Sequence, residues 1–264
     1  MNISIRLEEP KDYRTIEEID REAFWHQSTA CNEHLLTHKL RTSRDFIPEL
    51  DFVAELDGTL AGHIIYSRSK IVIKGGEITD VITFGPLAVL PEFQNRGVGK
   101  ALLRHSIAEA ARRGYRAIVI FGEPDYYPRL GFRRAAEFGI TTAEGATFDA
   151  FMVYPLYEGA LDGVGGVFHL PPVYEELTPE EASEFDGGFP YKEPASLAPI
   201  EVLLERLPPG ACAIIEGHDL RTLAEFRESS GREVEAWGEF TESDKAIMDA
   251  VMSEHGYGRK TWTK

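Results

Sequence analysis

Hydrophobic positions near the N-terminus of the chain recur at helical spacing. They predict an amphipathic helix over residues 12–25, begun by Asp12 as a cap, with one face formed by Ile16, Ile19, Ala23 and Phe24. Residues 32–42 predict a second, shorter helix. Over residues 52–73 apolar and polar positions alternate instead, which predicts strands.

Glycine-containing turns divide the strand-rich stretch. Asp57-Gly58 lies between two alternating runs, and Gly75-Gly76 lies between the runs "KIVIK" and "EITDVITF", so both dipeptides predict hairpins. The following strand, residues 82–89, carries Gly85-Pro86 in its middle. Because proline cannot donate a hydrogen bond to a neighbouring strand, we expect a bulge or a local splaying of the sheet there.

A longer helix and two further strands follow. Apolar residues along 97–113 predict a helix that faces the core and stops at Gly114, a residue suited to a left-handed turn. Residues 115–122 form a short apolar run typical of a buried strand, and residues 148–156 predict the last core strand. The order of helices, hairpins, a strand to helix to strand crossover and a final strand indicates the α+β class.

The last third of the chain differs in composition. Residues 175–264 hold nine Lys and Arg against twenty Asp and Glu, a formal charge of −11, which leaves −5 for residues 1–174. Proline, glycine and acidic residues interrupt the pattern, and two helices stand out over residues 199–207 and 243–257. We therefore predict a boundary near residue 174, followed by an acidic, partly helical C-terminal extension.

Composition and charge narrow the classes of function. The chain has 264 residues, 43% of them hydrophobic, which suffices for a large core, and its formal net charge is −16. Such an acidic surface repels phosphate backbones and anionic lipids, so we expect neither nucleic acid nor a membrane as partner. Without a long apolar run or a signal-peptide pattern, the sequence predicts a soluble, cytoplasmic protein. Cys31 and Cys212 are too few and too far apart to indicate a disulfide framework.

The stretch "PEFQNRGVGKALL" places two glycines at the start of the predicted long helix. A helix start exposes unpaired N–H groups and a partial positive charge, so it binds anions such as phosphate. A Walker loop is disfavoured because Gln94 and Ala101 stand where it needs Gly and Ser or Thr. A dinucleotide fingerprint is weak because Leu102 replaces its last small residue. The plain alternative is that the two glycines only begin a helix tightly.

Two segments of the sequence form a recognisable pair. Gln94-x-x-Gly97-x-Gly99 opens the predicted helix, and Tyr127 stands four residues before Gly131-Phe132, after the next strand. In this order and spacing they resemble motif A and the Tyr-x-x-x-Gly-Phe segment of the GCN5-related N-acetyltransferases, the GNAT family. The resemblance covers about residues 1–155. It implies the GNAT fold over residues 1–174, a mixed, mostly antiparallel sheet with a central splay and flanking helices, whereas the extension resembles no family.

The resemblance also implies an acetyl-CoA site. In such folds the pyrophosphate of this co-substrate binds to N–H groups of the helix-start turn, and its pantetheine arm pairs with the strand edge exposed at the splay. The partners expected in this sequence are Leu87, Ala88, Val89, Gln94, Asn95, Arg96, Gly97, Val98, Gly99 and Lys100.

Acetyl transfer to an amine needs a neutral nucleophile and a proton for the leaving thiolate. The resemblance implies Tyr127 as the acid near the sulfur; the alternative is a tyrosine that fills the core beside Phe132. Glu123, directly after a predicted strand, is the candidate for the general base, and Asp80 and Glu33 are further candidates. Each of these carboxylates is otherwise an ordinary solvated group.

The sequence favours an enzyme without a metal. His34 and His38, four residues apart, could share one helical face, but no third ligand is evident. The predicted function is transfer of an acetyl group from acetyl-CoA to the primary amine of a small, cationic substrate. The alternative is a non-catalytic module that binds or senses an acyl-CoA, with the acidic extension as a protein-interaction surface. A second copy of the chain is a candidate partner.

Overall fold

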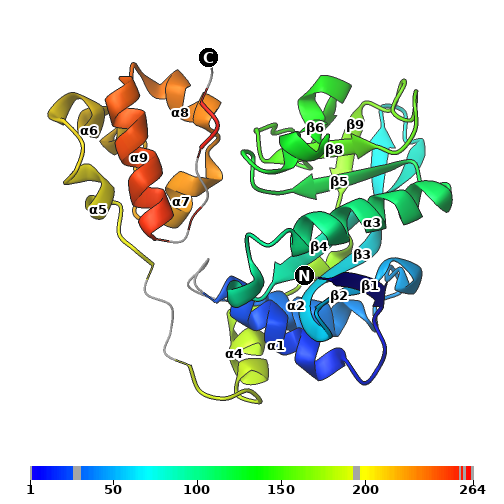
Figure 1. Ribbon diagram of the computed structural model, residues 1–264. Helices are drawn as coiled ribbons and strands as arrows, with labels where there is room; N and C mark the ends of the chain where they lie inside the picture. The colour runs from blue at the N-terminus through cyan, green and yellow to red at the C-terminus, as the bar shows by residue number, and fades with distance from the viewer. Residues whose placement is uncertain (1, 26–30, 193–196, 256, 258–259, 263–264) are drawn as a thin grey trace. The chain divides into compact units, whose positions relative to one another are not determined.

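The computed structural model describes residues 2–25, 31–192, 197–255, 257 and 260–262 (Figure 1). The chain forms two compact units. The first contains Met1–Val119, Ala135–Thr147 and Val153–Ala195, and the second contains Ile120–Arg134, Phe148–Met152 and Ser196–Lys264. In the described part of the chain, no helix is both long enough and apolar enough to cross a membrane.

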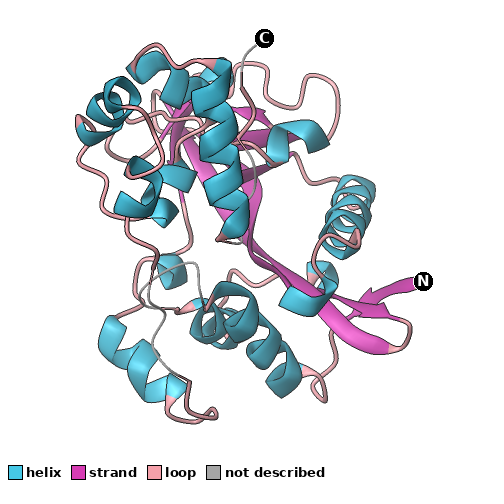
Figure 2. Cartoon of the chain, turned by 60° about the vertical axis from the view of Figure 1, so that its left-hand side comes forward, coloured by secondary structure: helices cyan, strands magenta, loops and turns pink. Residues whose placement is uncertain are grey.

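A mixed, mostly antiparallel sheet makes the core of the first unit, and Figure 2 shows its long strands with helices beside them. The strand order is β1-β2-β3-β4-β5, and β9 pairs with β3 and β7. The β4–β5 and β7–β9 pairs are parallel, whereas the β1–β2, β2–β3, β3–β4 and β3–β9 pairs are antiparallel. The strands are β1 Ile3–Leu7, β2 Phe52–Leu56, β3 Thr59–Ile73, β4 Ile78–Val89, β5 Ala117–Phe121, β7 Ile140–Thr141 and β9 Gly166–His169.

The hairpin turns lie where the sequence predicts them. Asp57 and Gly58 join β2 to β3, and Gly75 and Gly76 join β3 to β4, all four with positive φ. A positive φ suits glycine and, less often, Asp or Asn, which explains why these residue types mark the turns. The helices of this unit are α1 Tyr13–Phe24, α2 Glu33–Leu40, α3 Val98–Arg112 and α4 Pro179–Asp186.

Helices cover both faces of the sheet. On one face, Ile65 of β3 joins Leu36 and Leu40 of α2 in an apolar cluster. On the other face, the hydroxyl of Tyr66 is 2.8 Å from the Ser106 hydroxyl of α3. Because neighbouring strand residues point to opposite faces, α2 and α3 lie on opposite sides of β3. The predicted α+β fold with flanking helices is confirmed.

The irregularity predicted at Gly85-Pro86 is present. The register between β3 and β4 shifts opposite this dipeptide, between Ile64 and Tyr66. On the other side of β4, the described ladder with β5 contains one registered pair, Ile82 with Ile118. The C-terminal half of β4 therefore keeps its pairing with β3 but parts from β5, which is the expected central splay.

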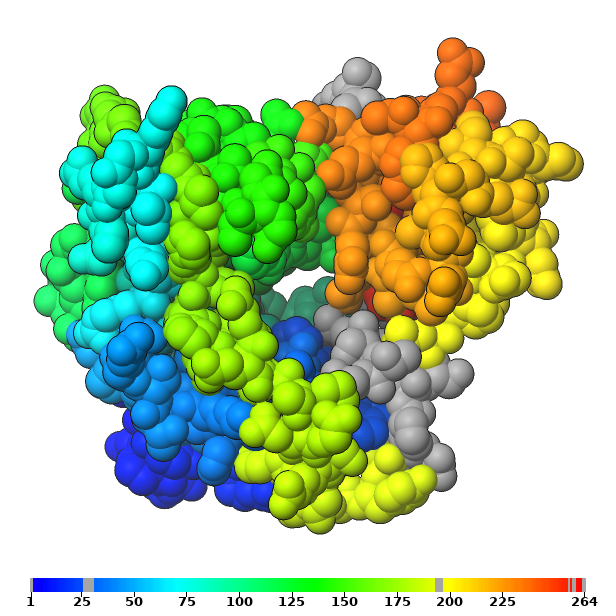
Figure 3. Space-filling view, turned by 180° about the vertical axis from the view of Figure 1, so that it is seen from behind, coloured from blue at the N-terminus to red at the C-terminus, as the bar shows by residue number. Residues whose placement is uncertain are grey.

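Residues after the sheet return to pack on α1 and α2. The guanidinium of Arg21 in α1 donates hydrogen bonds of 2.5 and 3.0 Å to Asp186 of α4, and His34 of α2 contacts two aromatic rings of the same segment. Figure 3 shows the yellow-green surface of α4 next to the blue surface of the N-terminal helices. The boundary near residue 174 stays a prediction, and the residues up to Ala195 belong to the first unit.

The second unit combines short helices with strand ends. The described helices of its C-terminal part are α5 Glu201–Leu204, α6 Pro209–Glu216, α7 Leu223–Glu228, α8 Gly231–Trp237 and α9 Glu242–Glu254. Their shared core contains Phe226, Met248 and Met252, each fully buried. The unit also holds the end of β5, the strand β6 Arg133–Arg134 and the start of β8 Phe151–Pro155.

Three local predictions are wrong. Asp12 stands at the N-cap of α1 but makes no capping bond, because its carboxylate accepts from Arg6, at 2.6 Å, and from the Glu9 N–H. The strand at 148–156 is not the last one, since β9 follows and pairs with β3. The helix predicted over 199–207 is limited to α5, four residues long.

Candidate functional site

The turn after β4 begins α3 through a left-handed glycine. Gln94 anchors the turn, because its side-chain amide donates a 3.1 Å hydrogen bond to the carbonyl of Val89. Asn95 has φ of +59° and Gly97, at the N-cap of α3, has φ of +86°. A side chain at such a φ is strained, so the conformation accounts for glycine at position 97.

The start of α3 presents N–H groups that helix geometry leaves without an acceptor. The first bond of the helix is the Ala101 N–H to the Gly97 carbonyl, at 3.0 Å. The preceding N–H groups, from Val98 to Lys100, therefore have no intrahelical partner and carry the positive end of the helix dipole. The first turn contains no acidic residue, and the side chains of Arg96 and Lys100 are exposed. The arrangement suits a phosphate group.

The predicted pantetheine partners lie on the strand that leads into this turn. In β4, Leu87, Ala88 and Val89 follow the bulge and pair with Ile64, His63 and Gly62 of β3. The registered pair between β4 and β5 lies at Ile82, before this stretch. The edge of residues 87–89 that faces away from β3 therefore has no strand partner among the described residues. All the predicted co-substrate residues thus belong to one continuous segment of the first unit, from the splay to the helix start.

Tyr174 is a neighbour of the splay that the sequence analysis missed. Its hydroxyl donates a 3.2 Å hydrogen bond to the carbonyl of Gly85 and accepts one, also 3.2 Å, from Ser67 on β3. Its ring lies against Gly85, where a Cβ would be 3.5 Å away. No local motif marks this residue, which lies 42 residues beyond the Gly131-Phe132 dipeptide.

Tyr127, the predicted acid, lies in the second unit. It begins a single 3-10 turn, Tyr127–Leu130, which ends at Gly131 with φ of +101°. The next residue, Phe132, is buried, and its ring contacts Tyr127 edge to face with centroids 5.3 Å apart. The Tyr-x-x-x-Gly-Phe spacing therefore corresponds to one 3-10 turn that ends at a glycine in the left-handed conformation. Gly122 lets the Tyr127 ring approach the backbone, since a Cβ there would be 2.5 Å from it.

Glu123, the predicted base, lies one residue after Gly122 in the same unit. Its carboxylate is 3.4 Å from the Arg227 guanidinium, and both side chains are about three-quarters buried. Burial raises the pKa of Glu123, and the positive charges of Arg227 and Lys260 oppose that shift. The co-substrate candidates therefore belong to the first unit and the two catalytic candidates to the second.

The other carboxylate candidates have different surroundings. Asp80 is exposed on β4. Glu33, at the start of α2, accepts hydrogen bonds from the Asn32 N–H and the Cys31 thiol, and burial raises its pKa. The Glu33 carboxylate therefore accepts a backbone N–H at the start of its own helix, where the positive end of the helix dipole favours a negative charge.

His34 and His38 each have a carboxylate neighbour. His34 is fully buried and its Nε2 lies 3.3 Å from Asp186. His38 is half exposed and its Nδ1 lies 2.9 Å from Glu17. His38 thus has a hydrogen-bond partner, whereas burial lowers the pKa of His34 and its Nε2 makes no hydrogen bond with a described residue. The absence of a metal stays a prediction.

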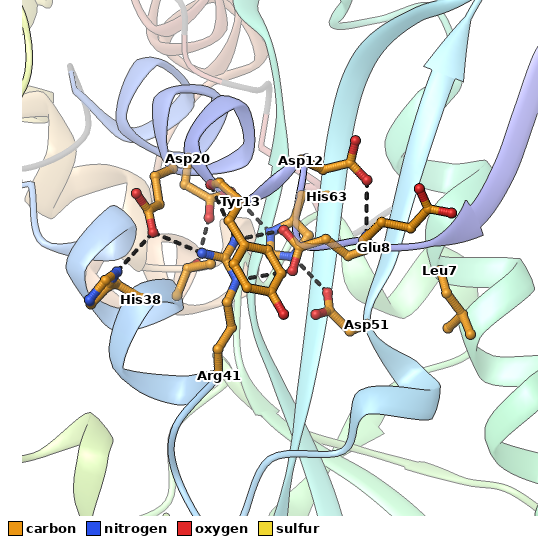
Figure 4. Close-up of polar contacts among 12 residues, drawn as sticks. Leu7, Glu8, Asp12, Tyr13, Asp20, His38, Arg41, Asp51 and His63 are labelled. Atoms are coloured by element: carbon orange, nitrogen blue, oxygen red, sulfur yellow. Dashed lines mark hydrogen bonds and ion pairs between the residues drawn. The ribbon is translucent and has the colours of Figure 1, made fainter.

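A buried ionic network lies between α1, β3 and the start of β2 (Figure 4). The fully buried ring of His63 has Asp20 at 3.2 Å from Nδ1 and Asp51 at 2.9 Å from Nε2. Burial lowers the pKa of His63, but the two carboxylates outweigh it and raise the pKa to about 10. Arg41 binds Glu8 through two hydrogen bonds, of 2.6 and 2.9 Å.

Among the described residues, one group of three side chains in this network has the spacing of metal ligands. One ligand atom each of Glu8, Asp51 and His63 lies within 4.8 Å of the others. Burial is the main cause that raises the pKa of Glu8, to about 8, with the His63 charge in opposition. Because both nitrogens of His63 already face carboxylates, the geometry is that of a structural ion-pair network between helix and sheet.

Comparison with known proteins agrees with this geometry. A family model described as the acetyltransferase (GNAT) family matches residues 14–132. The chain is 32% identical over 164 residues to the uncharacterized N-acetyltransferase YhbS of Escherichia coli, which covers 62% of this chain and 93% of that relative.

Solved structures show the same fold. The Escherichia coli YhbS structure in complex with CoA aligns with a TM-score of 0.60 and 27% identity, over 67% of this chain and 94% of the other. A GNAT family acetyltransferase from Brucella melitensis in complex with acetyl-CoA aligns with a TM-score of 0.52 and 27% identity, over 66% of this chain and 98% of the other. On the strength of its splayed sheet, its helix-start turn and these relatives, the chain belongs to the GNAT family of acetyltransferases.

Proposed function

We propose that this protein is an acetyl-CoA-dependent N-acetyltransferase that acts directly on the primary amine of a small, cationic substrate. Family membership supports acyl transfer in general. The observation that carries the proposal is the turn from Gln94 to Lys100, where the motif coincides with a left-handed glycine and a helix start. The two aligned structures that contain CoA or acetyl-CoA give further support.

Two neighbouring segments of the first unit provide the proposed co-substrate site. The N–H groups from Arg96 to Lys100 would bind the pyrophosphate, because the helix start offers unpaired donors and a positive dipole end. The backbone of Leu87 to Val89 would pair with the pantetheine arm at the splay. The remaining turn residues, Gln94 and Asn95, would hold the turn in shape.

Glu123 is the proposed general base. A lysine-like amine is protonated at neutral pH, and its deprotonation costs about 4 to 5 kcal/mol. A carboxylate that accepts this proton, directly or through water, offsets part of the cost. Burial of Glu123 supports the role, because it raises the pKa of the carboxyl and so strengthens it as a base.

Tyr127 is the proposed general acid. The neutral amine attacks the thioester carbonyl, the carbon–sulfur bond breaks, and the departing thiolate takes a proton from the tyrosine hydroxyl. The proton that the nitrogen loses as it becomes an amide returns, through water, to the tyrosinate, so the tyrosine is regenerated. A thiol has a pKa of about 8.5, so a weak acid is sufficient. Support comes from the Tyr-x-x-x-Gly-Phe spacing and from the partial exposure of the ring.

The acidic surface favours a cationic acceptor. A formal charge of −16 attracts cations and repels anions, so an amine of net positive charge is the best-matched acceptor class. A cytoplasmic location, a second copy of the chain as partner, and the exclusion of nucleic acid and membranes stay predictions. The role of the acidic extension as a surface for other proteins also stays a prediction.

Isothermal titration with acetyl-CoA, and with ATP and NAD as controls, tests the co-substrate site. We expect micromolar binding of acetyl-CoA alone, followed by thiol release when a panel of primary amines is added. Binding of ATP or NAD instead would contradict the proposed site. Binding of acetyl-CoA without thiol release from any amine would favour the non-catalytic acyl-CoA sensor.

A further inference from the structure

The C-terminal helices bind the segment that carries both catalytic candidates. The carboxylate of Asp125, two residues before Tyr127, accepts the N–H of Gly231 at 3.3 and 3.4 Å and the N–H of Thr261 at 2.8 Å. Asp125 is buried. A buried carboxylate that accepts backbone N–H groups from two distant segments fixes their separation, because loss of either bond leaves a buried charge unsatisfied.

A second carboxylate repeats this arrangement. Asp149, just before β8, accepts from the Ser230 hydroxyl at 2.7 Å and from the Arg232 guanidinium. In return the Asp149 N–H donates to Glu233 at 3.1 Å. The start of α8 is therefore held between two carboxylates of the second unit, and Ser230 and Glu233 also form the capping box of that helix.

The same C-terminal region places two positively charged side chains near Glu123. Arg227, in α7, is 3.4 Å from the Glu123 carboxylate, and Lys260, which is 5% exposed, adds a second positive charge. Asp125 faces Glu123 with a negative charge. Lys260 itself is held by the backbone carbonyl of Ser229, and burial lowers its pKa to about 8.

We propose that the C-terminal helical region, residues 197–262, contributes to the acetyltransferase reaction, in which Arg227 acts through Glu123 as a positioning residue that keeps the carboxylate ionised. This inference rests on the proposed function, because it assumes that Glu123 is the general base. It assigns a role to the part of the chain that lies beyond residues 14–132, the stretch matched by the family model.

The physical basis is the balance of burial and charge at Glu123. Burial favours the protonated carboxyl, which cannot accept a proton, whereas a guanidinium at 3.4 Å favours the carboxylate. Removal of the Arg227 charge should therefore reduce the fraction of active base at low pH and leave the rate at high pH almost unchanged.

The test compares Arg227→Gln with Arg227→Lys and with Arg206→Gln. Arg206 is the matched control, because it forms an ion pair with Glu254 in the same unit, on the exposed surface. With an amine found by the thiol-release screen, we expect Arg227→Gln to lower kcat/KM on the acidic limb of the pH profile by about tenfold. The alkaline plateau and the acetyl-CoA affinity should stay as in the wild type. Arg227→Lys should restore most of the acidic limb, and Arg206→Gln should leave the profile unchanged.

Two results would overturn the inference. A profile of Arg227→Gln that superimposes on the wild type shows that the guanidinium does not act on the base. A uniform loss at every pH, with no rescue by lysine, shows a structural role only. If the wild type releases thiol but Glu123→Gln is fully active, the base assignment fails and the acetyltransferase proposal stands. If no amine releases thiol, the proposed function itself fails.

A measurement that needs no acceptor gives an independent answer. The carboxyl carbon of Glu123 can be followed by NMR through a pH titration and assigned by its loss in Glu123→Gln. We expect Arg227→Gln to move the titration of this carbon to higher pH and Arg206→Gln to leave it in place. An unchanged titration in Arg227→Gln would refute the proposed role of Arg227.

Discussion

The start of α3 allows binding and stability to be changed in opposite directions by one substitution, Gly99→Glu. Gly99 is the second residue of this helix, and the first turn contains no acidic side chain. A glutamate there replaces a poor helix former and places a negative charge at the positive end of the helix dipole. The same charge would stand in the proposed pyrophosphate site.

The two effects can be estimated. Helix propensity contributes about 0.5 kcal/mol and the dipole about another 0.5 kcal/mol, so the variant should be more stable by about 1 kcal/mol. Against one phosphate charge at about 5 Å, with an effective dielectric constant of about 20, repulsion costs about 3 kcal/mol. Acetyl-CoA should therefore bind at least about 100-fold more weakly.

Titration calorimetry and urea unfolding measure the two quantities on the same samples. Gly210→Glu is the matched control, because Gly210 is likewise the second residue of a helix, α6, and no atom lies within 4 Å of a Cβ built there. This control should keep the wild-type affinity for acetyl-CoA. Undiminished binding by a folded Gly99→Glu would refute the phosphate site. A variant that loses stability together with affinity would refute the helix argument.

Further predictions concern the tyrosines and the buried network. Tyr127→Phe should lower kcat at least about tenfold with little change in acetyl-CoA affinity, as expected for loss of a general acid; an unchanged kcat would support the core-filling role. Tyr174→Phe removes the hydroxyl that bonds to the Gly85 carbonyl, so stability should fall by about 1 kcal/mol in urea unfolding, and an unaltered midpoint would contradict that bond. The raised pKa values of His63, about 10, and Glu8, about 8, mean that folding favours their protonated forms. The stabilisation from Glu8 is complete below about pH 4.5 and is lost as the pH rises through about 8, and that from His63 is complete below about pH 6.5 and is lost as the pH rises through about 10. The loss is about 1.4 kcal/mol per pH unit for each proton, and unfolding free energies that stay level between about pH 6.5 and 9 would show that no such protons are held.

Several features of the fold could be predicted because they depend on neighbours in the sequence. Asp57-Gly58 and Gly75-Gly76 mark hairpins, since the turns need positive φ and few residue types adopt it. Gly85-Pro86 marks the splay because proline lacks the N–H that a ladder requires. Such rules fail where the signal is weak, as in β9, whose four residues carry too short a pattern to be recognised.

Other features depend on residues that the chain brings together from far apart. The capping interpretation of Asp12 fails because Arg6, on β1, competes for its carboxylate. Glu123 could be named from its place after a strand, but its partner Arg227 lies more than a hundred residues later, with no motif around it. Local patterns do not encode such pairs, since each partner by itself is an ordinary charged residue.

The sequence by itself determined the family, the α+β class and the helix-start turn from Gln94 to Lys100, because periodicity, turn chemistry and glycine requirements act over a few neighbouring residues. Only the tertiary structure decided that Tyr174 contacts the splay and that Asp125 binds the start of α8. Those contacts arise from the burial of polar groups, each of which must find a hydrogen-bond partner wherever the folded chain supplies one.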